Sequence, residues 1–469
     1  LGVLSIALVV IIIDFLKISA FSVGLYFVAL VLSILLLRAL VELVTKRQIN
    51  IAHKVLGHLS VVLLTFAVIG CDLEVNNPNS LLEDDLKDPS AASAVANGAW
   101  NAALRGISYM MMPYTVAGDE SVWIGSRDAW RQIDKGGMTN EYNEFVDQAW
   151  PYISEARWMA DEAVTRLGEF NSAGTLPDVQ DLVLAHLTAA MVRIYIADFF
   201  DDFVYSNKTV SGTPIGAANM HQLYDEAMDL LNGAESIADA SNKVKVLALK
   251  ARVAHAEGVW GKLNPSVNTN APYVSAGATE AAAAAALMSA DYKWKMNFSA
   301  STVSNYMSGQ INSRQEMDLL YNAGVANGDT FPNDIVTGTT DTRMQAEFDL
   351  FKNTANGTDY APITIVSLRE MHLIIAESKL AGGDNAGCLA ELNAIRAFDG
   401  LAAYASSQDA AAAFKHERRA NLFIQGRRLA DMYRFGEKSV VWDPVEQSPA
   451  GSFFPITIQE IRANPNINQ

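Results

Sequence analysis

Apolar residues recur at helical spacing along most of the chain beyond residue 88, and this pattern predicts a series of amphipathic helices. In 220–239, for example, Leu223, Ala227, Leu230 and Ala234 fall on one face of a helix. Asp88-Pro89 is a start signal for the first helix, and Asp384 is a candidate cap for a late one. The predicted helices span 90–105, 145–168, 180–200, 220–239, 243–258, 281–286, 362–381, 384–396 and 408–435.

Two polar tracts separate these helices, at 260–279 and 322–345, and both are rich in Asn, Thr, Gly and Pro. Strand signals are confined to 122–124 and 453–456. We therefore predict a mainly α fold of tetratricopeptide-like helical pairs, although the strict repeat signature is absent. We expect the rest of the fold to consist of a few short strands and of long irregular loops that bind the ligand.

The segment from Val55 to Cys71 has the form of a secretory signal, with basic residues before an apolar run that ends in small residues. Cys71 directly after Val68-Ile69-Gly70 matches a bacterial lipobox, and polar sequence follows at once. We expect Cys71 to be the acylated amino terminus of the mature protein. The alternative is a buried apolar helix with an incidental cysteine.

A second apolar stretch precedes this signal, because residues 18–37 carry no charge and are long enough to cross a bilayer. One interpretation is a start set too far upstream, with residues 1–43 untranslated and a true start near Val44. The other is a genuine membrane anchor with one or two spans. In either case we assign 1–70 to the upstream apolar segment plus signal peptide, and 71–469 to one helical domain.

The charge of the mature chain is strongly negative, since residues 71–469 hold 30 basic and 50 acidic residues. Such a surface repels phosphate backbones, and we expect no nucleic-acid partner. Cys71 and Cys388 are the only cysteines, so acylation of Cys71 leaves no intrachain disulfide. The histidines are scattered without ligand spacing, and we predict no metal site and no cofactor.

Several motifs occur in a recognisable order along the mature chain. They are WPYISEA at 150–156, ADFFDDFVY at 197–205, EMHLIIAE at 370–377, LNAIR at 392–396, HERRANLFIQGRRLADMYRFG at 416–436 and FPITIQEIRANPNINQ at 454–469. Together after a lipobox they resemble the SusD/RagB family of nutrient-binding outer-membrane lipoproteins. The chain departs from the family pattern at Asn421 and Gln425, which stand at two usually acidic positions.

Charged residues within these motifs have two interpretations. One group of charged residues could bind an acidic ligand, or it could form a structural ion-pair cluster that links the last helix to the core. We favour the structural cluster, which consists of Glu417, Arg418, Arg428 and Asp431. Glu370 and Glu377 share one helix face, where paired carboxylates could do glycosidic chemistry. Pairing with the nearby arginines is the interpretation that we prefer. His255 and His372 are expected to be packed helix residues, and Gly426 to mark close packing or a bend.

The candidate ligand contacts are aromatic residues with polar neighbours. Residues 109–130 are expected to be irregular, and a second cluster follows the alanine run. Sugar rings stack their C–H faces on aromatic side chains while polar groups bind the hydroxyls. The alternative is that these aromatic residues pack loops onto helices. The candidates are Tyr109, Tyr114, Trp123, Arg127, Asp128 and Trp130 in the first cluster, and Tyr292, Trp294 and Tyr306 in the second.

The resemblance implies a lipid-anchored outer-membrane protein, facing the cell surface, that binds a nutrient such as an oligosaccharide. Its implied partner is a SusC-like TonB-dependent transporter, and no catalysis is expected. Two other classes stay open: a helical-repeat scaffold lipoprotein with a protein partner, and a glycoside hydrolase.

Overall fold

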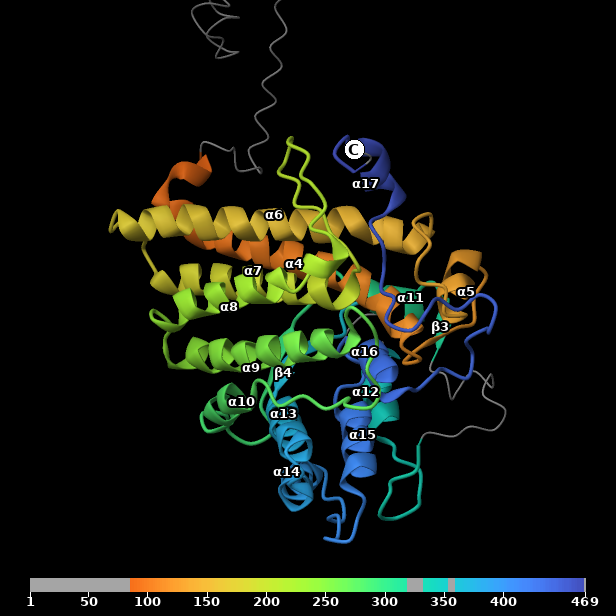
Figure 1. The fold of residues 1–469 in the computed structure, drawn as a ribbon. Coiled ribbons are helices and arrows are strands. Elements are labelled where there is room, and N and C mark those ends of the chain that lie inside the picture. Colours follow the sequence, from red (N-terminus) through yellow and green to blue (C-terminus); the bar gives the residue numbers. More distant parts are fainter. Residues whose placement is uncertain (1–84, 319–331, 353–358, 468–469) are drawn as a thin grey trace, which may run out of the picture. The chain divides into compact units, whose positions relative to one another are not determined.

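Long helices follow one another as packed layers in the structure, a computed structural model that describes residues 85–318, 332–352 and 359–467 (Figure 1). Each of the main helices packs on the next: α4 on α6, α6 on α7, α7 on α8, α8 on α9, α9 on α10, α10 on α13 and α13 on α14. The bounds are α4 (Ala92–Ala117), α6 (Glu144–Ser172), α7 (Val179–Phe199), α8 (Gln222–Glu235), α9 (Ala240–Leu263), α10 (Ala278–Ala285), α13 (Leu368–Ala381) and α14 (Asn385–Phe398). This arrangement confirms the predicted mainly α fold with paired helices.

Side-chain caps explain where many of these helices begin. Asp88 accepts the amide of Ser90 at the short 3-10 turn η2 (Pro89–Ala91), which leads into α4. Asp384 accepts the amide of Gly387 and caps α14 as predicted. Asn143 and Asp178 do the same for α6 and α7. Each cap satisfies amides that the first helical turn leaves without a partner.

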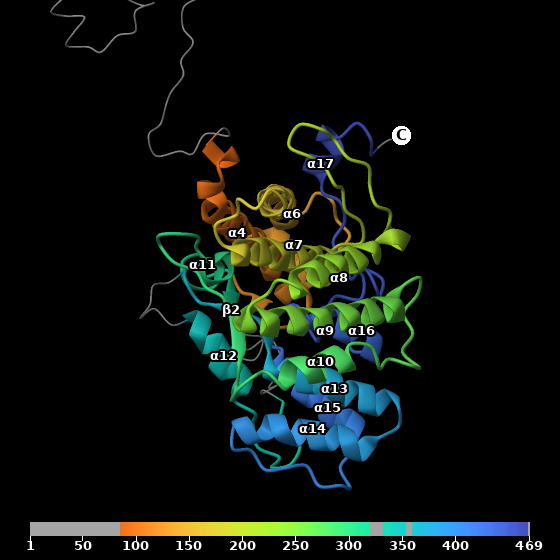
Figure 2. The same ribbon diagram turned by 90° about the vertical axis from the view of Figure 1, so that its left-hand side faces the viewer.

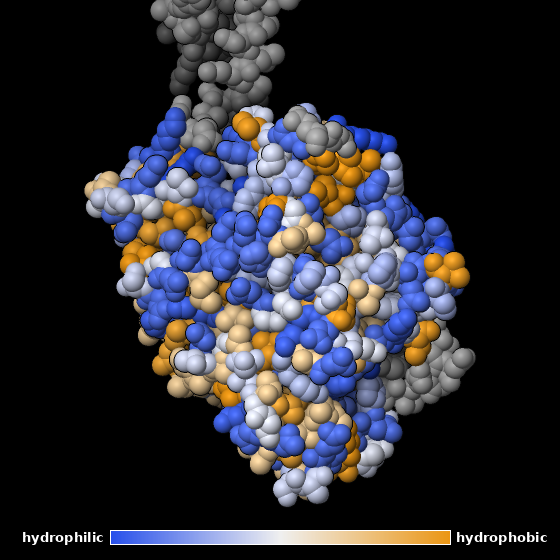
Figure 3. All heavy atoms as spheres, viewed as in Figure 1, coloured by the Kyte–Doolittle hydropathy of each residue, from blue (hydrophilic) through white to orange (hydrophobic). Residues whose placement is uncertain are grey.

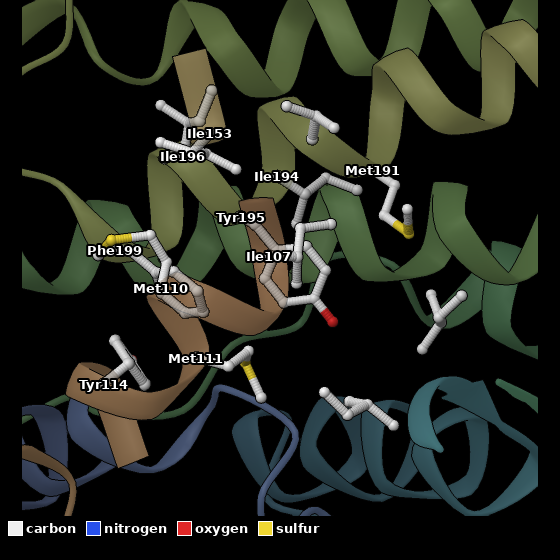
Figure 4. Packing of buried hydrophobic residues seen from close by; sticks show 14 of the residues in the cluster. Ile107, Met110, Met111, Tyr114, Ile153, Met191, Ile194, Tyr195, Ile196 and Phe199 are labelled. Atoms are coloured by element: carbon white, nitrogen blue, oxygen red, sulfur yellow. The ribbon is translucent and has the colours of Figure 1, made fainter. Parts of the chain in front are cut away.

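The core lies where α4, α6 and α7 meet (Figure 4). Ile107 and Met111 from α4, Ile153 from α6 and Ile194 from α7 are all buried there. Helix α7 is apolar enough to pass as a membrane span, yet 83% of its most apolar window is buried inside the protein. It is therefore the central core helix of the described residues.

Shorter elements complete the described chain. They are the helices η1 (Asp85–Lys87), α5 (Asp128–Asp134), η3 (Ala217–Asn219), α11 (Tyr306–Asn312), α12 (Arg343–Lys352), α15 (Ala410–Asn421), α16 (Arg428–Phe435) and α17 (Ile458–Ala463). The strands are β1 (Val122–Trp123), β2 (Lys293–Met296), β3 (Met317–Asp318) and β4 (Ile363–Ser367), and they form two antiparallel pairs, β1 with β3 and β2 with β4.

Three predicted boundaries are wrong. Helix α4 continues to Ala117, so Tyr109 and Tyr114 lie on a helix and not in an irregular segment. Residues 363–367 form strand β4 before α13 begins, because an apolar run of β-branched residues suits a buried strand as well as a helix. The segment 453–456 contributes an isolated bridge between Phe454 and Phe200.

The predicted last helix, 408–435, is also wrong, because it is two helices, α15 and α16. Between them Ile424 and Gly426 adopt positive φ angles of 55° and 75°, which a continuous right-handed helix forbids. A Cβ at position 426 would lie 3.0 Å from Sδ of Met111 and from Cζ of Phe199. The predicted role of Gly426 in close packing or a bend is thus confirmed on both counts.

The short elements gather beside the helix stack. Helix α11 packs on α4, and α5 packs on both α4 and α6. In the view of Figure 2, α11, α12 and β2 lie together on one side of the layers. Hydrophilic side chains predominate on the face drawn in Figure 3, with separate hydrophobic patches between them.

Candidate functional site

A cavity of about 320 Å³ opens between α4, the start of α6, α11 and the residue that precedes α5. Its aromatic lining comes from Tyr109, Phe145 and Tyr306. The polar lining is larger and includes Arg127, Glu144, Gln148, Asn305, Gln310 and Arg314. The volume falls at the lower end of the range typical of small-ligand sites, roughly 300–1,000 Å³.

Two stacked tyrosines form the aromatic wall. The rings of Tyr109 on α4 and Tyr306 on α11 lie 3.9 Å apart between centroids, at an interplanar angle of 20°. The Tyr306 hydroxyl donates to Oε1 of Gln148 at 3.0 Å. Burial, with Tyr109 beside it, raises the pKa of Tyr306, so its hydroxyl stays protonated at physiological pH. Both rings are half-buried, so each retains some exposed surface at the cavity.

The start of α11 fixes the position of Tyr306. Asn305 is buried, and its side-chain oxygen accepts the amide of Met307 at 2.9 Å. Its Nδ2 donates to the carbonyl of Ala361 at 2.7 Å. Because Asn305 is tied to two segments, the aromatic wall is held before any ligand binds.

At the same cavity, Arg127 forms an ion pair with Glu144 and lies over the ring of Phe145, 5.6 Å from its centroid. Trp130 stacks under Phe145 with a centroid distance of 3.8 Å. Trp130 is fully buried, so it has no surface open to solvent and instead supports Phe145. The guanidinium of Arg127 thus lies over the apolar ring of Phe145, with the carboxylate of Glu144 beside it.

The loop 123–127 is held by one carboxylate. Oε2 of Glu316 accepts the amide of Ser126 at 3.0 Å and the amide of Arg127 at 3.3 Å. It also accepts the indole Nε1–H of Trp123 at 3.2 Å. Gly125 permits this approach, because a Cβ there would lie 2.8 Å from Cα of Glu316. The loop carries Arg127 to the cavity, and Trp123 anchors that loop without lining the cavity.

The structure does not bring the other predicted residues to this cavity. Tyr114 is buried against Phe199, with 4.3 Å between ring centroids. Asp128 is exposed and accepts Nε of Arg131 at 2.8 Å. Tyr292 and Trp294 lie at β2, where Trp294 stacks on Trp100 at 5.8 Å. Cys71 lies outside the described residues, as do 1–70.

Sequence reasoning misses most of the polar lining. Gln148, Asn305, Gln310 and Arg314 belong to no motif, and nothing in their local sequence marks them as neighbours. The sequence groups Tyr306 with Tyr292 and Trp294, yet it joins Tyr109 instead. The position of Tyr306 directly after Asn305, a residue type that often caps helices, is the one local signal that could place Tyr306 at a helix start.

The charged residues of the C-terminal motifs form a buried structural network, as we predicted. Glu377 pairs with Arg434, and it accepts Nε2 of His255 at 2.8 Å. Arg418 donates from Nε to Asp431 at 2.6 Å. Burial opposes ionisation of Glu377, but Arg434 and His255 outweigh it and hold the pKa of this carboxyl far below its usual value. Such a network ties α9, α13, α15 and α16 together.

One group in the described residues has the composition of a metal site, Asp334, His416 and Glu417. Nη1 of Arg396 already lies 2.6 Å from Asp334 and 2.8 Å from Glu417. Because a fixed guanidinium supplies the positive charge there, these residues do not fit a metal ion.

The chain resembles solved structures, although no protein-family model matches it and no curated protein matches its sequence. A SusD superfamily protein from Bacteroides fragilis shares 16% identity, with a TM-score of 0.57 over 81% of this chain and 99% of that one. One from Bacteroides vulgatus shares 12%, with a TM-score of 0.57 over 82% and 98%. A SusD-like carbohydrate binding protein from Bacteroides vulgatus shares 13%, with a TM-score of 0.56 over 81% and 97%. The chain therefore has the fold of the SusD superfamily.

Proposed function

We propose that this chain is a nutrient-binding lipoprotein of the SusD/RagB family and that it binds an oligosaccharide in the cavity of about 320 Å³. The observation that carries the proposal is the stacked pair of Tyr109 and Tyr306, set among polar side chains on a SusD-superfamily fold. One of the similar structures is of a carbohydrate binding protein, which supports this ligand class.

The chemistry of the lining suits a sugar. An exposed tyrosine edge or face offers apolar contact to the C–H groups of a sugar ring, at roughly 25 cal/mol per Å² of apolar surface buried. Gln148 and Gln310 provide amides that both donate and accept, while Arg127 and Arg314 donate only. In the proposed site Trp123 and Trp130 act as supports for the loop and for Phe145, and Arg127 is the predicted residue that contacts ligand beside Tyr109.

We further propose a lipid anchor at Cys71 and delivery of the ligand to a SusC-like TonB-dependent transporter at the outer membrane. The lipobox supports the anchor, and the acidic mature chain leaves lipid as its means of membrane attachment. A tether raises the local concentration of the binding protein at its transporter without any new contact.

Binding without catalysis fits the carboxylates of the cavity. Three carboxylates line the cavity. Glu316 holds the loop 123–127, Glu144 is paired with Arg127, and Asp359 accepts the hydroxyl of Ser313 at 3.2 Å. A glycosidase needs two carboxyl groups free to act on opposite sides of the scissile bond. Because each of the three carboxylates already has a partner, the site supports a binding protein over the hydrolase alternative.

The test is calorimetric titration of residues 71–469 against a panel of neutral and acidic oligosaccharides, followed by chromatography of each mixture. Saturable binding with intact oligosaccharide supports the proposal, whereas released products would identify a hydrolase. No binding to any glycan, together with co-purification of a protein other than a TonB-dependent barrel, would favour the scaffold alternative.

A further inference from the structure

A second cavity, of about 270 Å³, lies between α12, β4 and the turn that joins α15 to α16. Arg343 and Glu347 line it from α12, Thr364 from β4, and Gln425 from the turn. It shares no lining residue with the cavity of Tyr109 and Tyr306. The two cavities are therefore separate, and an occupant of one does not touch the lining of the other.

The guanidinium groups of this second cavity are already occupied. Arg369 uses all five of its N–H donors, on Asp291, Asp399 and Asn421, at 2.7–2.9 Å. Arg343 donates to Asp341 and to Glu417. An anionic ligand would find these charges neutralised and would face the carboxylates that neutralise them.

The groups left free are mainly acceptors. Gln425 is 6% exposed, and its Nε2 donates to the carbonyl of Asn421 at 2.9 Å. Its Oε1 has no hydrogen-bond partner within the part of the chain that the structure describes. Glu347, at the same cavity, is likewise unpaired among those residues. A buried acceptor without a donor costs about 1–3 kcal/mol. Less than 1 Å² of Oε1 is accessible, so a ligand at this cavity recovers that energy only by turning the Gln425 amide toward it.

Lys293 adds a donor to the lining of the same cavity. The Nζ of Lys293 forms an ion pair with Asp291 at 3.7 Å, which is beyond hydrogen-bond distance and leaves its N–H groups able to donate to a ligand. A hydroxyl group accepts from an ammonium and donates to an amide oxygen at the same time. An ammonium ligand would meet Lys293 as a like charge. Leu350, which is 42% exposed, adds apolar surface, whereas Phe423 at the same cavity is only 4% exposed.

We propose that this cavity is a second binding site, for a neutral polyhydroxylated molecule of about one sugar ring. Its hydroxyls accept from Lys293 and donate to Glu347, and to Gln425 once that amide turns toward the cavity, while its C–H groups contact Leu350. This site is independent of the first cavity and does not require that the first one binds sugar.

Saturation-transfer NMR with the folded chain tests the proposal. The neutral probes are glucose, galactose, mannose, xylose and myo-inositol, and the charged probes are glucuronate and glucosamine. Ala346→Trp places an indole at the cavity from an exposed position of α12, and Ala412→Trp is the matched control on an exposed position of α15 outside the cavity. Glu347→Ala is a second variant, which removes a free acceptor without filling the space.

We expect at least one neutral probe to give a signal that Ala346→Trp reduces five-fold or more and Glu347→Ala weakens. Ala412→Trp and Tyr306→Ala should leave it unchanged, which separates this site from the first cavity. A signal that Ala346→Trp and Glu347→Ala both leave intact would overturn the proposal. So would binding of glucuronate or glucosamine alone, or the absence of any neutral probe signal sensitive to Ala346→Trp.

Discussion

The indole Nε1 of Trp123 and Oε2 of Glu316 lie 3.2 Å apart, and this hydrogen bond joins the end of β1 to the residue that precedes β3. The same carboxylate accepts the amides of Ser126 and Arg127. A single side chain that is 8% exposed thus sets the course of the loop that carries Arg127 into the candidate site.

Glu316→Ala should lower the free energy of unfolding by roughly 2–3 kcal/mol, because it leaves several partly buried donors without an acceptor. Trp123 should become more exposed, with a red shift of its fluorescence. Denaturant unfolding measures the first effect and emission spectra the second. Glu347→Ala is the matched control, and we expect it to stay within about 0.5 kcal/mol of the wild type. Equal stability of the two variants would contradict the role given to Glu316.

Gly426→Ala should destabilise the protein by roughly 2–4 kcal/mol, from left-handed backbone strain and from contact with Met111 and Phe199. Gly400 has a similar φ of 64°, but a Cβ added there would meet no neighbouring atom within 4 Å. Gly400→Ala therefore isolates the backbone strain, and we expect a loss of only about 1 kcal/mol. Thermal unfolding compares them, and a loss at Gly426 no larger than at Gly400 would refute the packing argument.

Glu120 should make stability fall as the pH rises. Burial, with Asp119 beside it, raises the pKa of its carboxyl to about 8, whereas the unfolded chain titrates near 4.5. Between these values the folded state holds a proton that the unfolded state has lost, so the free energy of unfolding decreases with pH.

Glu120→Gln should remove this dependence, since its amide oxygen can still accept the amide of Ile424, which lies 2.8 Å from Oε1 of Glu120. Between pH 5 and pH 8.5 the stability of Glu120→Gln, measured against the wild type at the same pH, should rise by roughly 4 kcal/mol. Urea unfolding at both pH values measures it, with Glu162→Gln, on the partly exposed face of α6, as the control. Parallel pH profiles for wild type and Glu120→Gln would contradict the assignment.

Cys71 is expected to be the acylated first residue of the mature protein. Intact-mass measurement of protein extracted from membranes should give a lipidated chain that begins at residue 71. A Cys71→Ala variant should lack the mass of the lipid and should remain as the uncleaved precursor. A mature chain without lipid, or one that retains residues 18–37, would rule the lipobox out.

Helical periodicity predicted the layered helices well, because each helix buries a regular stripe against its neighbour. It failed at 422–427, where the apolar spacing continues although Ile424 and Gly426 break the helix. The backbone there is set by tertiary contacts, such as the bond from the Ile424 amide to Glu120. Periodicity in one segment carries no information about a partner so distant in the chain.

The candidate site shows the same limit. Aromatic residues flanked by polar ones pointed to Tyr109 and Arg127, and both line the cavity. The same pattern pointed to Trp130 and Tyr114, which are buried, because the sequence does not say which side of α4 or α5 faces the core. The pairing of Tyr109 with Tyr306 depends on the docking of α11 on α4, and no local pattern encodes that contact.

The central claim is that the cavity of Tyr109 and Tyr306 binds an oligosaccharide, and calorimetric titration of two tyrosine variants tests it most directly. Tyr306→Ala removes half of the stacked pair, whereas Tyr142→Ala removes a tyrosine that is 59% exposed and does not line the cavity. With the tightest-binding oligosaccharide of the panel, we predict at least ten-fold weaker affinity for Tyr306→Ala, about 1.4 kcal/mol, and unchanged affinity for Tyr142→Ala. Wild-type affinity in a folded Tyr306→Ala protein would contradict the account.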